Sequence, residues 1–218
     1  MWVLNLINKI MAIFSSLILL VFGVGSVKYT INFVNFDGAM ISSLKVSQDE
    51  FVTPPLNPEK SGATFIGWSG NYFCANNNET VKAVFDDEKN VIVVSNTSGK
   101  IGDTVKVLIK IDGKVKTCGF DLTINYSDEL KLVSIDNDLD LDIVSNSNTG
   151  SNIIYLNFSS ATDKTKSKDI IELTFKVKET TKSALPIEVS VEAIKEISGN
   201  KVVDTEYVVV DGFVKTIV

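Results

Sequence analysis

Residues 119–126 read GFDLTINY, and this stretch decides the fold because its apolar residues alternate strictly with polar ones. The same alternation recurs at residues 105–111 (VKVLIKI), 171–177 (IELTFKV) and 187–192 (IEVSVE), with Leu108 as the exception. A period of two places one face of a strand against a core and the other in water, which is typical of antiparallel sheets. Turn signals such as Asp112-Gly113 and Asp211-Gly212 separate the stretches. The sequence therefore predicts an all-β sandwich or barrel beyond residue 26.

Composition narrows the possible functions. The chain has 218 residues, which is one or two modest domains, and its formal net charge is −6. All 21 basic residues are lysine, so the bidentate arginine contacts that favour nucleic-acid binding are missing. The sequence has no histidine and only two cysteines. Histidine-based catalysis, histidine-ligated metal sites and cysteine-rich zinc sites are thereby excluded, and we expect neither an enzyme nor a bound cofactor.

The first 25 residues are predicted to be a hydrophobic export helix. Residues 10–25 carry no charge, and Lys9 with the terminal amine supplies a positive flank. This length suits the core of a signal peptide, whereas adding the apolar residues before Asn8 approaches a membrane-spanning anchor. Cleavage and retention both remain open, with a buried core helix as the remaining alternative, and retention would make the membrane a partner. Cleavage and retention both predict an extracellular protein, secreted or anchored at a bacterial cell surface.

The two cysteines are expected to be buried thiols that form no disulfide. Cys74 and Cys118 lie on opposite sides of a charged run at residues 86–90, DDEKN. Three of the four prolines precede this run, which places a domain boundary there. We therefore expect domains at residues 27–86 and 91–218. A domain of about 60 residues is close to the lower limit for independent stability, so it is expected to lean on its neighbour.

The segment from Tyr29 to Phe85 resembles the internalin-B-type, or Listeria–Bacteroides, repeat, a β-grasp-like module. The resemblance rests on residues 29–33 (YTINF), 36–38 (FDG), 54–55 (PP), 65–68 (FIGW) and 80–85 (TVKAVF), together with Val46, Pro58 and Gly62. Ala63 departs from the pattern, which usually has an aromatic residue there. The resemblance implies a spacer or adhesion module without catalysis. Trp68 is expected to cap the small core, and a sugar-stacking platform is the alternative.

Residues 91–218 resemble a cohesin domain, the jelly-roll sandwich that receives dockerin modules in cellulosomes. The resemblance lies in the order and spacing of residues 91–95 (VIVVS), 102–105 (GDTV), 119–126, 153–159 (IIYLNFS), 171–177 and 211–215 (DGFVK). It implies that one sheet face, built from the third, fifth, sixth and eighth strands, binds the partner. Carbohydrate-binding sandwiches share this architecture.

Alternation indicates which side chains of that face point outward. In the third strand these are Asp121, Thr123 and Asn125, and in the sixth they are Ile153, Tyr155 and Asn157, followed by Ser159 or Ser160. Glu188, Ser190 and Glu192 follow in the eighth strand. The resemblance places Asp121 at a common acidic contact position, and Ser160 where many members have an acid. Ile153 and Tyr155 are the expected anchors, because an exposed tyrosine beside an apolar residue suits a docking hot spot.

A calcium loop is not expected in this chain. Aspartates at positions 136, 138, 140 and 142 alternate, but neither possible register has the glycine and glutamate that an EF-hand requires. These aspartates are expected to line a solvated strand edge. The leading hypothesis is a non-catalytic exported scaffold protein whose second domain binds a dockerin-type protein. The alternatives are a polysaccharide-binding module, a structural stalk or a fragment of a longer adhesin, with the sheet face then merely solvated.

Overall fold

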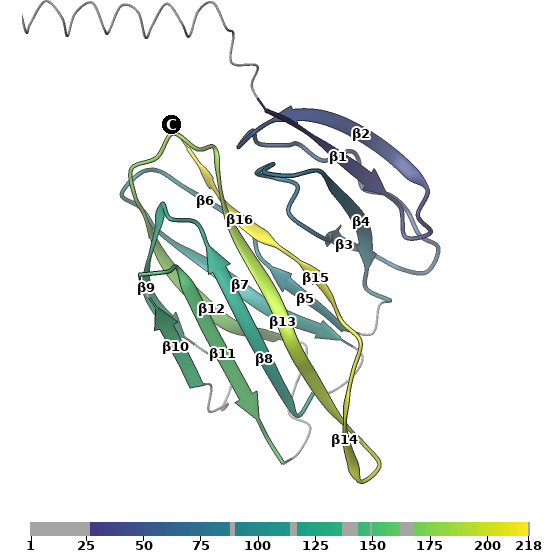
Figure 1. Cartoon of the computed structure of the whole chain (residues 1–218). Coiled ribbons are helices and arrows are strands. Elements are labelled where there is room, and N and C mark those ends of the chain that lie inside the picture. The colour runs from purple at the N-terminus through teal and green to yellow at the C-terminus, as the bar shows by residue number, and fades with distance from the viewer. Residues whose placement is uncertain are drawn as a thin grey trace, which may run out of the picture.

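The computed structural model describes residues 27–87, 90–113, 117–136, 144–148, 150–161 and 168–217. Strands, turns and loops make up these ranges, and the elements contain no helix. This confirms the all-β prediction for the described part of the chain (Figure 1). A helix able to cross a membrane is not found within the described ranges. The predicted export helix at residues 1–25 lies outside them.

Residues 27–87, the first unit, form a four-stranded sheet with the order β2-β1-β4-β3. Its strands are β1 (Lys28–Val34), β2 (Met40–Ser47), β3 (Phe65–Trp68) and β4 (Glu79–Phe85). Strand β1 pairs parallel with β4, and the other pairs are antiparallel. Asp37 and Gly38 turn the chain between β1 and β2, and Gly38 has a φ of 87°, which glycine adopts without strain.

The first unit has a small core of its own. Trp68 is 2% exposed, and its ring packs edge-on against Phe33 and Phe65, with centroids 5.0 and 5.4 Å apart. The same cluster includes Ile31, Val81 and Phe85. Trp68 therefore caps the core as expected, and its indole is not presented to solvent.

Residues 90–217, the sandwich, contain the remaining strands. These are β5 (Asn90–Val94), β6 (Thr97–Gly99), β7 (Thr104–Gly113), β8 (Gly119–Tyr126), β9 (Leu130–Asp136), β10 (Val144–Asn148), β11 (Ile153–Ser159), β12 (Lys168–Val177), β13 (Ala184–Ser198), β14 (Lys201–Asp204), β15 (Val208–Val210) and β16 (Gly212–Thr216).

The sandwich consists of two facing sheets (Figure 1). One sheet has the order β10-β11-β8-β13-β16-β6, with β14 paired to β13, and the other has the order β15-β5-β7-β12-β9. Between them lies one large apolar cluster, which includes Ile109, Leu122, Ile154, Phe175 and Ile187. These residues come from the alternating stretches in the sequence, so hydrophobic burial explains why the two sheets stack.

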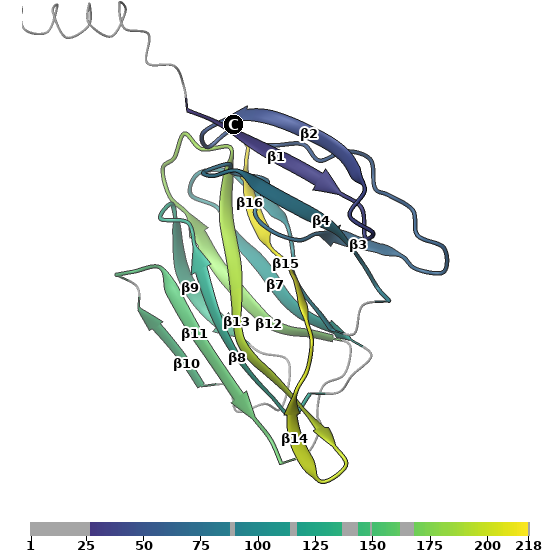
Figure 2. The ribbon, with the colours of Figure 1, turned by 45° about the vertical axis from the view of Figure 1, so that its right-hand side comes forward.

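The first unit packs against the sandwich along the strands β5, β15 and β16 (Figure 2). One cluster joins Phe73 and Cys74 of the first unit to Ala184 and Phe213 of the sandwich. A second cluster joins Val84 and Ile66 to valines of β5 and β15. A Cβ atom on Gly67 would come within 2.7 Å of Val210, so this contact leaves no room for a side chain. The small unit thus packs against its neighbour, and its dependence on that contact for stability stays a prediction.

Both cysteines are buried, and the structure joins neither in a disulfide. This agrees with the expectation of buried thiols. The Cys74 thiol donates a hydrogen bond to Oδ1 of Asp49 at 3.6 Å. Burial, together with the nearby Asp49 carboxylate, raises the pKa of Cys74 to about 11. The reactive thiolate form is therefore scarce at neutral pH.

Candidate functional site

Strands β8 and β11 present the predicted residues on the outer face, which is the side of their sheet that points away from the core. Alternate residues of β11, such as Ile154 and Leu156, are buried, and the residues between them point outward. The strand register aligns the outward residues in three cross-strand pairs: Asp121 with Asn157, Thr123 with Tyr155, and Asn125 with Ile153. The structure thus brings together six of the seven predicted residues.

The seventh residue, Ser160, lies just beyond the end of β11. Its backbone N–H donates to the carbonyl of Cys118 at 2.7 Å, which continues the strand pairing by one step. Ser160 is half-buried, whereas Ser159 before it is exposed. Of the two serines left open by the sequence, Ser159 is therefore the more exposed at this end of the face.

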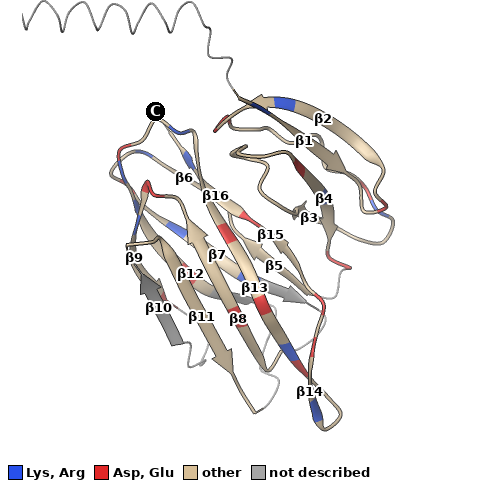
Figure 3. Cartoon of the chain, in the orientation of Figure 1, with Lys and Arg blue, Asp and Glu red and all other residues tan. Residues whose placement is uncertain are grey.

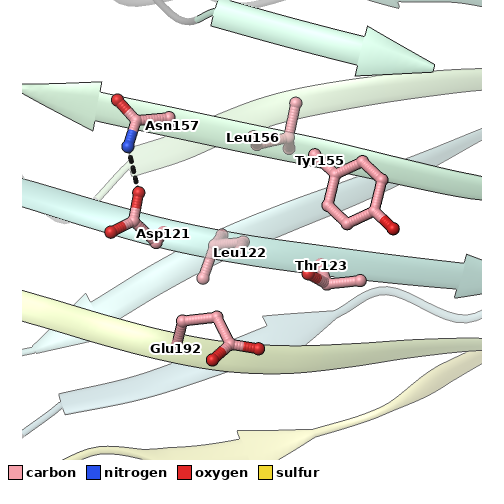
Figure 4. A pocket seen from close by; sticks show the side chains of 7 residues that line it. All are labelled: Asp121, Leu122, Thr123, Tyr155, Leu156, Asn157 and Glu192. Carbon is pink, nitrogen blue, oxygen red and sulfur yellow. Dashed lines mark hydrogen bonds between the residues drawn. The ribbon is translucent and has the colours of Figure 1, made fainter.

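Tyr155 lies on β11, the strand next to the sheet edge, and stands beside a shallow hollow of the outer face (Figure 4). Tyr155 is 48% exposed, so a large aromatic residue is open to solvent on this face. The hollow has a volume of about 200 Å³ and is lined by Asp121, Leu122, Thr123, Tyr155, Leu156, Asn157 and Glu192. The amide of Asn157 donates a hydrogen bond to the Asp121 carboxylate, which fixes one wall.

Strand β13 completes the face and contains an irregularity that alternation did not predict. Glu188 pairs with Asn125 and Ser190 with Thr123, but the register shifts between Val191 and Ala193. This β-bulge leaves Glu192 exposed and unpaired in the ladder, where it lines the hollow. Glu188, Ser190 and Glu192 therefore belong to the outer face, as the sequence indicated.

The charge of the outer face is mostly negative. Figure 3 shows acidic segments on β8 and β13, and the sequence of β11 has no charged residue. Lys195, at the far end of this stretch of β13, forms an ion pair with Asp204 of β14. Lys195 also interacts electrostatically with Asp121. Glu188 and Glu192 belong to none of the described ion pairs, so this part of the face favours a partner with basic side chains.

A cluster of acidic residues beside this face was not predicted from the sequence. Asp211 has a partly buried carboxyl group whose oxygen accepts a hydrogen bond from the Val189 N–H at 2.9 Å. Burial, together with nearby Glu188 and Glu79, raises the pKa of Asp211 to about 6. Burial and Glu188 also raise the pKa of Glu79. In the sequence, Asp211 looked like an ordinary turn residue before Gly212, and no local pattern marks these acids as neighbours.

Other sequence features have plain structural roles. Tyr126 is buried against Phe175, with ring centroids 5.0 Å apart, so it points inward as alternation predicted. The Tyr207 hydroxyl donates to the Val191 carbonyl at 2.9 Å. Asp136 accepts a hydrogen bond from Ser134, and the other three aspartates of the alternating run lie outside the described residues. Within the described ranges, no group of three potential ligands could hold a metal ion.

The two-sheet sandwich with an exposed outer face on β11, β8 and β13 can now be compared with known proteins. The sequence profile of the cohesin domain family matches residues 90–216. The chain belongs to the cohesin family. Cohesins are non-catalytic protein-interaction modules, and the jelly-roll fold predicted from the sequence is thereby confirmed.

Solved cohesin structures share this fold at low sequence identity. The seventh type I cohesin of ScaB from Pseudobacteroides cellulosolvens is 17% identical, with a TM-score of 0.53, over 59% of this chain and 92% of its own. A non-cellulosomal cohesin from the archaeon Archaeoglobus fulgidus is 15% identical, with a TM-score of 0.52, over 60% and 93% of the two chains. The OlpA cohesin from Clostridium thermocellum, solved with a dockerin, is 18% identical, with a TM-score of 0.53, over 60% and 100%. A comparison with curated protein sequences gives no match.

Proposed function

We propose that the outer face of the β11-β8-β13 strands binds a dockerin-type module. The observation that carries this proposal is the 48% exposure of Tyr155 beside a hollow of the sheet face. A half-exposed aromatic ring gains a large buried area when a partner covers it, and it loses little side-chain entropy. Membership of the cohesin family supports the same partner class.

The proposed mechanism is surface complementarity. Ile153 and Tyr155 are the apolar anchors, and the hollow receives a protruding side chain of the partner. Asp121, held by Asn157, and Glu192 flank the hollow and fix the register through polar or charged contacts. Any calcium in the complex would belong to the dockerin-type partner, and the face performs no chemical step.

We further propose how the chain divides into domains and where in the cell the protein is located. Residues 27–86 would be an internalin-B-type β-grasp repeat, supported by the parallel β1–β4 pair and by a separate core. Residues 91–218 would be the cohesin module, and residues 1–25 a signal peptide or signal anchor. The protein would then be a non-catalytic scaffold at a bacterial cell surface. Mass spectrometry of the N-terminus of the exported protein distinguishes cleavage from retention.

Replacing Tyr155 by alanine tests the partner. We expect the dissociation constant for a calcium-loaded dockerin module encoded in the same genome to rise by about 30-fold or more, the effect of losing one hot-spot residue. Isothermal titration calorimetry with the full chain measures it. Val133→Ala, at a position 57% exposed on β9 of the opposite sheet, is the matched control and should bind normally.

Two outcomes would contradict the proposal. If dockerin modules fail to bind the unaltered protein, the proposal that the partner is a dockerin is wrong. If the Tyr155 variant binds as tightly as the unaltered protein, the proposal that this face is the binding surface is wrong. Binding to polysaccharides on a glycan array, lost in the same variant, would favour the carbohydrate-binding alternative instead.

A further inference from the structure

The first unit touches the outer face at Glu188. The carboxylate of Glu188 accepts a hydrogen bond from the side-chain amide of Asn71, which lies between β3 and β4. Glu188 pairs across the strands with Asn125, and Asn125 pairs with Ile153. Asn71 therefore extends one of the three rows of the proposed docking surface, and it does so from the other unit.

On β16, the strand after β13 in the sheet, the first unit covers the outer face. Phe213 of β16 precedes the core residue Val214, so its ring points away from the core, yet it is only 9% exposed. Phe51 and Phe73 of the first unit lie over it, with ring centroids 5.4 and 4.7 Å away. Ala184 is buried in the same cluster. The outer face thus ends against a wall formed by the first unit.

A docking partner needs more contact area than the three rows of the outer face provide. The rows at Asp121, Thr123 and Asn125 extend over about 14 Å along β8, and the three strands are about 5 Å apart. The area they enclose is roughly 140 Å², whereas a stable protein interface covers about 800 Å² on each partner. A partner centred on Tyr155 must therefore reach well beyond these rows. On the β13 side, the neighbouring surface is the first unit.

We propose that the docking surface is composite, and that the first unit contributes the segment around Asn71 to it. The inference rests on the proposed function, because the occupant is the same dockerin-type module seated on β11, β8 and β13. Its basic side chains would face Glu188 and Glu192, and its flank would contact residues 69–72. The surface is continuous with the interface between the two units.

The test uses the full chain and a dockerin module that the unaltered protein binds. Asn71→Ala removes the side chain that would contact the partner and that holds Glu188 in its row. We expect the dissociation constant to rise about two- to tenfold, the range for losing one polar contact with the partner. The matched control is Ser43→Ala, which also removes one side-chain hydrogen bond, to Asn32 at 2.7 Å, but on β2 at the opposite edge of the small sheet. The control should bind normally.

A second measurement needs no substitution. Hydrogen–deuterium exchange of the unaltered complex should show slower exchange at residues 69–72 than in the unbound protein, and no change at the turn of residues 35–39. Unchanged exchange at residues 69–72 would overturn the composite surface, as would binding of the Asn71 variant equal to that of the Ser43 variant. Tighter binding by the Asn71 variant would also overturn it, because the segment would then obstruct the partner. If Tyr155→Ala still weakens binding in these cases, the proposed function survives. If no dockerin binds the unaltered protein, both the proposed function and the composite surface are wrong.

Discussion

Replacing Phe213 by alanine is expected to lower the free energy of unfolding by about 3–5 kcal/mol, the usual loss for a buried phenylalanine. Phe213 is 9% exposed and packs against Phe51 and Phe73, so the substitution would open a cavity between the two units. Urea unfolding followed by circular dichroism measures the change. The loss would be a large part of the stability of a domain this size.

Val133→Ala provides the control for this prediction as well. Val133 is 57% exposed, and surface substitutions usually change the unfolding free energy by less than about 0.5 kcal/mol. A loss of similar size in both variants would contradict the view that the interface stabilises the protein. A separate early transition in the Phe213 variant would identify the first unit as the part released.

Replacing Asp211 by asparagine is expected to stabilise the protein above pH 6. The pKa of Asp211 is raised from 3.8 to about 6 by burial, and by Glu188 and Glu79. The folded state therefore holds its proton more tightly than the unfolded state, so stability is lost as the pH rises from about 4 to 6. The loss is roughly 3 kcal/mol at neutral pH, at about 1.4 kcal/mol for each pKa unit. Asparagine keeps an oxygen that can accept the Val189 N–H and carries no charge.

The measurement is the difference in unfolding free energy between the Asp211 variant and the unaltered protein across pH 3 to 8. The two proteins should be nearly equal below pH 4, diverge up to about pH 6, and differ by a constant amount above it. A difference independent of pH would show that the Asp211 carboxyl is not held protonated by its surroundings.

The two strands that carry most of the proposed site were predictable because hydrophobic burial alone sets their faces. In β8 and β11 the side-chain period of two is unbroken, so Tyr155 could be assigned to solvent and Tyr126 to the core. The bulge after Val191 was not predictable, because a register shift depends on the partner strand and not on local composition. The side chains of β10, expected as the fifth strand of the face, lie outside what the structure describes.

The contact between the two units had a weak signal in the sequence. Residues 91–94 read VIVV, and a continuous apolar run is typical of a strand buried on both faces. In the structure, Ile92 and Val94 enter the sandwich core, whereas Val91 packs against the first unit. Phe213 and Val214 show the same two-sided burial. The sequence could not show which element covers each outer face, because that depends on packing between residues far apart in the chain.

The position of β1 has a mechanical consequence. Strand β1 lies inside the small sheet, antiparallel to β2 and parallel to β4, and the chain enters it at Lys28. Tension applied at Lys28 along this strand would shear both hydrogen-bonded ladders at once, so many bonds would share the load instead of opening one by one. The packed junction with the sandwich would pass that load on towards β13. A partner held on the outer face would then be tethered through a stiff link.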